Sequence, residues 1–282
     1  MRLLARLHRI DRRWLYVATL VLMLVPFILP LTLPAGHVAR TTRAAFELID
    51  SCPPDKVVII DSSWDAGSQA ENRAQLEAVV AHLCRRRIKF VVTSLGVTAL
   101  GPDFARDIIR PLAERAGYEY GRDWVQLGFV QGVAGALGPL IDRFCRDLWG
   151  LYPRDVHNTP VEELPLMQAV RRGADAHAFC CFTYAPAYEW ISFANAQYGL
   201  RLVFGCMTIM CPAYYPYIDS GQLAGMLVGN VGAAEYEALN GVAGRGTRLG
   251  VPAAFGNCAI IIAAVLGNIG LWAERRGRRA AA

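Results

Sequence analysis

Two long apolar runs lie near the ends of the chain, and both predict transmembrane helices. Trp14–Leu33 has 20 residues without a charge, and Val251–Trp272 has 22. About 20 helical residues cross the hydrocarbon core of a bilayer. Aromatic residues that favour the interface, among them Tyr16, stand at their ends. A cleaved signal peptide for the first run, and a buried core helix for the second, are the alternatives.

Between these runs, short apolar segments alternate with longer segments of helical periodicity. Five short runs rich in β-branched and aromatic residues predict buried strands: Lys56–Asp61, Lys89–Ser94, Val125–Val130, Ala176–Tyr184 and Leu200–Thr208. Continuous apolar strands that alternate with helices indicate a parallel sheet covered on both faces. We predict an α/β domain with a Rossmann-like, doubly wound, mainly parallel five-stranded sheet.

Start and stop signals place helices between these strands. Ser68 with Glu71 three residues later is the pattern of a capping box at a helix start. Further helices are expected over four segments: Pro102–Ala116, Pro139–Trp149, Thr159–Arg172 and Pro186–Tyr198.

The charges at the two ends predict the topology. Five arginines precede the first apolar run and four follow the second, whereas the inner flanks are weaker. The positive-inside rule then puts both termini in the cytoplasm. We expect a two-pass protein of the cell (inner) membrane with five parts: a basic tail (1–13), transmembrane helix 1 (14–33), an extracytoplasmic α/β domain (34–250), transmembrane helix 2 (251–272) and a second basic tail (273–282).

Composition agrees with a membrane location and excludes nucleic acid as a partner. Hydrophobic residues make up 54% of the chain and charged residues 19%, and the net charge is +5. The two tails hold nine arginines against Asp11 and Glu274, a net +7, which leaves 20 basic and 22 acidic residues for everything between. The folded domain is therefore nearly neutral, and the tails favour anionic lipid heads.

Polar residues follow several predicted strands, at the edge where such folds bind ligands. They are Asp61, Ser62, Ser63 and Asp65 after the first strand, Thr93 and Ser94 after the second, Thr183 and Tyr184 after the fourth, and Thr208 after the fifth. Asp61, Ser62 and Thr93 are the catalytic candidates. The alternative is that Asp61 caps a helix or accepts bonds from loop amides.

Motifs for common cofactors and metals are missing from the sequence. It has no P-loop, no HExxH and no GxSxG, and its five histidines form no metal-spaced pair. Gly132-x-x-Gly135-x-x-Gly138 follows the third strand but is not the dinucleotide fingerprint. We expect no cofactor and no metal, and an enzymatic role stays uncertain.

The cysteines offer one disulfide candidate. Cys206 and Cys211 are spaced so that they can bridge outside the membrane. Cys145, Cys180 and Cys206 also fit apolar patterns and have an alternative interpretation as small core residues.

The segment Tyr214–Glu237 is the most distinctive of the chain. Gly221, Gly225 and Gly229 recur every four residues, and Gly232 follows. On a helix these glycines form a smooth face on which another helix can pack. We predict that they form an interface with Tyr214 and Tyr217; a glycine-rich loop is the alternative.

The segments YPYIDSGQLAGMLVGNVGAAEYE and TPVEELPLM, with the two flanking apolar runs, resemble an uncharacterised group of prokaryotic membrane proteins. That resemblance implies one α/β domain between two transmembrane anchors and implies no activity.

Two functions follow as hypotheses. The first is a non-catalytic subunit or scaffold of a membrane assembly, a homo-oligomer or a complex with other membrane protein subunits. The alternative is a membrane-bound ligand-binding or hydrolytic domain with its site near Asp61. The second hypothesis requires a concave pocket and a perturbed carboxylate at the strand ends.

Overall fold

The computed structural model describes residues 11–29, 38–96, 98–133 and 136–279, and at its centre is a parallel sheet of six strands. The strands are β1 (Val58–Ser63), β2 (Phe90–Gly96), β3 (Trp124–Gln131), β4 (Ala178–Thr183), β5 (Leu202–Cys206) and β6 (Gly225–Val228). They run in the order β3-β2-β1-β4-β5-β6, which is the Rossmann order, and each neighbouring pair is parallel. The predicted fold class is confirmed, but the prediction of five strands is wrong because β6 was missed.

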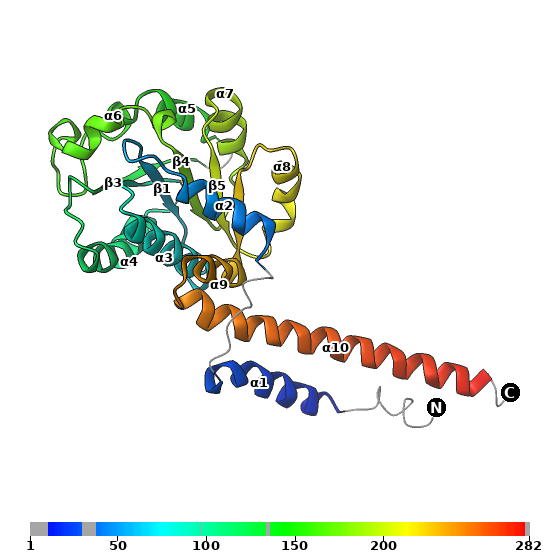
Figure 1. The fold of residues 1–282 in the computed structure, drawn as a ribbon. Helices are drawn as coiled ribbons and strands as arrows, with labels where there is room; N and C mark the ends of the chain where they lie inside the picture. The colour runs from blue at the N-terminus through cyan, green and yellow to red at the C-terminus, as the bar shows by residue number, and fades with distance from the viewer. Residues whose placement is uncertain (1–10, 30–37, 97, 134–135, 280–282) are drawn as a thin grey trace.

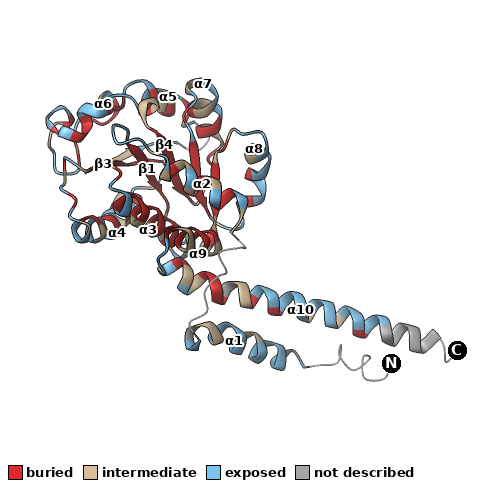
Figure 2. Cartoon of the chain, viewed as in Figure 1, coloured by how far each residue is buried: buried red, intermediate tan, exposed pale blue. Residues whose placement is uncertain are grey.

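Helices cover both faces of the sheet (Figure 1). One face carries α2 (Arg40–Asp50), α3 (Gln69–Arg86), α4 (Gly101–Arg115) and α9 (Gly229–Asn240). The other carries α5 (Gly138–Arg146), α6 (Leu148–Leu151), α7 (Ala196–Tyr198) and a π-helical turn, Trp190–Asn195; α8 (Tyr215–Asp219) lies beyond β5. The strands are buried along most of their length, as Figure 2 shows, which explains their continuous apolar runs.

Two local predictions about helices are wrong. The segment predicted as a helix over Thr159–Arg172 forms two short 3-10 turns, Val161–Glu163 and Pro165–Ala169. Pro165 forces the preceding Leu164 into an extended conformation, which ends the first turn. The capping box does not form either, because the Glu71 carboxylate accepts a hydrogen bond from the Thr208 amide at 2.7 Å instead.

The helices α1 (Arg12–Ile28) and α10 (Arg245–Arg279) lie side by side and project from the domain (Figure 1). Within the described residues, one helix is long and apolar enough to span a membrane, the segment Arg245–Trp272. The predicted span Trp14–Leu33 is not found as such a helix: the apolar part of α1, Arg13–Pro26, is shorter, and residues 30–33 lie outside the described ranges. The one candidate span among the described residues therefore starts earlier than the predicted second span, and the predicted first span is not supported.

Candidate ligand-binding site

Asp61 lies near the end of the central strand β1 and is fully buried. Its Oδ1 accepts hydrogen bonds from the Leu95 amide at 2.9 Å and from Thr93 Oγ1 at 3.2 Å. Its Oδ2 accepts one from Ser63 Oγ at 2.5 Å. Burial raises the pKa of Asp61 to about 7, although these hydrogen bonds act in the opposite direction. The carboxyl group therefore titrates near neutral pH.

The fold explains why these groups meet. Asp61 is in register with Thr93 on β2 and with Cys181 on β4. The chain leaves β1 toward β2 and β3 on one side, and β4 to β6 continue the sheet on the other. The carboxyl ends of β1 and β4 thus form the topological switch point, where such folds leave a crevice for ligands.

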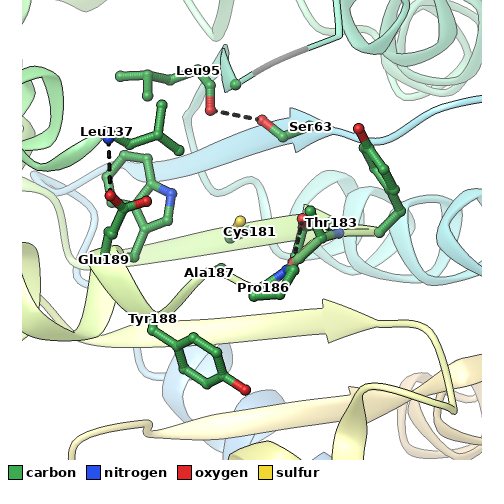
Figure 3. A pocket seen from close by; sticks show the side chains of 13 residues that line it. Ser63, Leu95, Leu137, Cys181, Thr183, Pro186, Ala187, Tyr188 and Glu189 are labelled. Atoms are coloured by element: carbon green, nitrogen blue, oxygen red, sulfur yellow. Dashed lines mark hydrogen bonds between the residues drawn. The ribbon is translucent and has the colours of Figure 1, made fainter. Parts of the chain in front are cut away.

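A cavity of about 350 Å³ lies at this switch point (Figure 3). The strands β1, β2 and β4 contribute Ser63, Leu95 and Cys181, and Leu137 lines it from the loop before α5. The rest of the wall is the continuous segment Thr183–Trp190. The volume is at the lower end of the range for small-molecule sites.

Hydrogen bonds hold the Thr183–Trp190 wall in place. Thr183 Oγ1 accepts from the Ala185 amide at 3.1 Å, and Tyr214 Oη accepts from the Ala187 amide at 2.8 Å. Glu189 Oε1 accepts from the Leu137 amide at 2.9 Å, which joins the wall to the start of α5 (Figure 3). The sequence analysis identified Thr183 and Tyr184 but missed the rest of the wall, because an apolar loop carries no motif.

Several predicted site residues form hydrogen bonds with Asp61, but Ser62 does not. Thr93 binds the Asp61 carboxyl group and is itself buried. Side chains alternate along a strand, so Ser62 points to the opposite face, where it donates to the Gly101 carbonyl at 2.9 Å. Its candidacy as a catalytic residue is therefore wrong. Thr208 is bound to Glu71 and does not line the cavity.

The cysteines near the site are free thiols in this structure. Cys181 Sγ lies 3.8 Å from Asp61 Oδ2, and burial raises its pKa well above the ordinary value. A protonated thiol is a poor nucleophile, so Cys181 lines the cavity but its thiol is not activated for covalent chemistry. The Cys206 and Cys211 sulfurs are 3.7 Å apart, and the predicted bridge between them stays a prediction.

The predicted glycine interface is not a helix face. Gly221 lies in a turn with φ +78°, Gly225 lies in β6, and Gly229 and Gly232 lie in α9. A Cβ at Gly225 would come within 2.5 Å of the Ala45 amide, so this glycine lets α2 pack closely on β6. The four-residue spacing thus falls across a turn, a strand and a helix.

The two tyrosines predicted at that interface pack inward. Tyr214 is fully buried and its ring contacts Phe204. Tyr217 packs against the core beside Tyr188. Tyr214 is therefore inaccessible to another chain, and Tyr217 is only partly exposed.

The site contains no complete catalytic set. No histidine lines the cavity, and the described histidines have structural partners: His82 lies between Asp50 and Tyr236, at 3.0 and 2.8 Å. No group of three potential metal ligands occurs in the described ranges. What the arrangement offers is a mostly apolar hollow with a few polar atoms, which is the composition of a binding pocket.

Comparisons with protein-family models, with curated proteins and with solved structures found no match for this chain.

Proposed function

We propose that this protein is a membrane-attached binding protein that holds a small organic molecule in the switch-point cavity. The observation that carries the proposal is the cavity itself, which lies at the carboxyl ends of β1 and β4 and near a fully buried carboxyl group. Apolar walls from Leu95, Leu137 and Trp190 supply affinity, and the Ser63 hydroxyl orients a polar end of the ligand.

This proposal adopts the alternative that the sequence analysis left open. That alternative required a concave pocket and a perturbed carboxylate, and both are present. The scaffold hypothesis loses the glycine interface that supported it, since the glycines lie on different elements. An assembly role is compatible with ligand binding, but no described contact favours it.

Membrane attachment is the second part of the proposal. The exposed side chains of α10 between Ile260 and Trp272 are mainly apolar, as a lipid-facing helix requires. We propose that α10 spans the bilayer with α1 beside it and with the domain outside the cytoplasm, as the arginine distribution favours. In spheroplasts, which lack the barrier of the outer membrane, an externally added protease should then digest the domain; a domain that is protected there but digested after detergent lysis would contradict this orientation.

The binding function is tested by filling the cavity. Ala185 lines it, and Ala70 is an exposed residue on α3, so Ala185→Phe and Ala70→Phe form a matched pair. Native mass spectrometry of the detergent-purified protein should show a bound small molecule in the wild type and in Ala70→Phe, and its loss in Ala185→Phe. Equal occupancy in both variants would contradict the proposed site.

A further inference from the structure

The charge around the cavity has one sign. None of its described lining residues is an arginine, a lysine or a histidine, whereas Glu189 contributes a carboxylate. Glu189 Oε1 accepts from the Leu137 amide, and no described basic side chain forms an ion pair with Glu189. Glu189 is half-buried, and its one described hydrogen bond is to a neutral backbone amide, so its charge has no side-chain counterion among the described residues.

A second carboxyl group stands behind the same wall. Asp61 reaches the cavity through Ser63, which lines it and donates to Asp61 Oδ2 at 2.5 Å. The groups that act on Asp61 are hydrogen-bond donors, with no cationic side chain among them. Glu189 therefore lines the hollow and Asp61 lies behind Ser63, and no described arginine, lysine or histidine lines the hollow.

Aromatic residues complete the lining. Tyr184, Tyr188 and Trp190 come from the same short segment as Glu189. Aromatic rings attract cations through the negative potential of their faces, and sites for quaternary ammonium groups combine several rings. A cation would add an ion pair to the hydrogen bond that Glu189 Oε1 already accepts from the Leu137 amide, whereas a neutral ligand would not and an anion would be repelled.

We infer that the ligand of this cavity is a small organic cation, an amine or a quaternary ammonium compound, with its charge toward Glu189 and its apolar part against Leu95 and Trp190. The inference rests on the proposed function and specifies its ligand class. It assigns the ion-pairing role to Glu189 and an aromatic contact with the ligand to Tyr184, which lines the same cavity.

The test compares three probes of almost the same shape: choline, which is a cation, its neutral carbon analogue 3,3-dimethylbutan-1-ol, and the anion 3,3-dimethylbutanoate. Isothermal titration of the full chain in detergent measures each affinity. We expect choline to bind at least about ten-fold more tightly than the neutral analogue, since charge-assisted contacts in a shielded site are strong. The anion should show no binding.

Variants then identify which residue causes the preference for choline over its neutral analogue. Glu189→Gln keeps an acceptor for the Leu137 amide, so it should fold normally and reduce the preference for choline to about two-fold or less. Glu163→Gln, on an exposed turn, should leave the preference unchanged. Tyr184→Leu should weaken choline by about two- to thirty-fold and leave the neutral analogue unaffected.

Other outcomes overturn the inference and separate it from the proposed function. Equal affinity for choline and its neutral analogue, with both lost in Ala185→Phe, would leave the binding site standing and refute the cation. A preference for choline that survives Glu189→Gln would also refute the assignment. If none of the three probes binds, the inference is refuted. The proposed function is then still tested separately, by whether mass spectrometry finds a co-purified molecule that Ala185→Phe loses.

Discussion

Glu237 on α9 accepts a hydrogen bond from the hydroxyl of Thr247, in the first turn of α10, at 2.7 Å. The same carboxylate accepts from the backbone amides of Gly244, Gly246 and Thr247 at 2.7 to 2.8 Å. A buried side chain of the domain therefore caps the start of the apolar helix and fixes its direction.

Replacing Glu237 with alanine should destabilise the junction between the domain and α10. The change leaves several buried amide groups without an acceptor, and we expect a loss of about 2–4 kcal/mol. For a chain of this size, the loss lowers the melting temperature by roughly 4–16 °C. Thermal melting in detergent measures it, and Glu163→Ala is the matched exposed control. A shift below about 1 °C would show that water or other groups replace the cap.

Asp61 should make stability depend on pH. Its pKa is about 7 in the folded chain and 3.8 when exposed, so between these values the native state binds more protons than the unfolded state. Stability therefore falls as pH rises from about 4 to about 7, by about 4 kcal/mol in total.

The Asp61→Asn variant tests this pH dependence. An amide at this position keeps an acceptor and donors for its neighbours and does not titrate, so the difference in melting temperature between wild type and variant should decrease or change sign as pH rises toward 7. Parallel curves for the two proteins from pH 4.5 to 7.5 would contradict the raised pKa of Asp61.

Gly225 and Gly267 should respond in opposite ways to a methyl group. A Cβ at Gly225 meets the Ala45 backbone, and nothing lies within 4 Å of one at Gly267. Gly225→Ala should cost about 1–3 kcal/mol through strain between α2 and β6. Gly267→Ala, in the interior of α10, should be neutral or slightly stabilising.

Size-exclusion chromatography with light scattering adds a second measurement to the glycine variants. The particle mass of Gly225→Ala should match that of the wild type wherever the variant is folded. If the particle mass of Gly225→Ala differs from that of the wild type while its melting temperature does not, the glycine repeat would be an interface between chains after all.

Cys206 and Cys211 should be the pair most readily joined by a mild oxidant. Their sulfurs are in contact at 3.7 Å, whereas Cys145 is buried in the core without a described thiol neighbour. Peptide mapping after diamide treatment, with alkylation of the remaining thiols, should find the Cys206–Cys211 bridge. Recovery of both as alkylated thiols would show that the folded chain holds them apart.

The sequence predicted the parts of the fold that depend on local pattern. The β-branched runs located β1 to β5 to within a few residues. The alternation of continuous apolar strands with helices predicted that the sheet is parallel. β6 was missed because Gly225 suggested helical spacing, although its role is to admit α2, which is a tertiary contact. Pro165 is a residue type that ends helices, but the prediction gave more weight to the helix-start signal at Thr159.

The site was predictable only in part, for a similar reason. Asp61 and Thr93 could be named because parallel strands bring their ends to one edge. Glu189 could not be named, because its position depends on a bond to Leu137, 52 residues away. Which of two neighbours on a strand faces the cavity, Ser62 or Ser63, could not be predicted, because every residue of β1 is buried and a continuous apolar run does not distinguish the two faces of the sheet.

The helix α1 packs along α10, and the first residues of α1 and the last described residues of α10 lie at the same end of the helix pair, far from the domain (Figure 1). If α1 lies in the membrane beside α10, as proposed, the domain has an attachment on each side. A single proteolytic cut on one side would then not release it, because the other attachment stays intact.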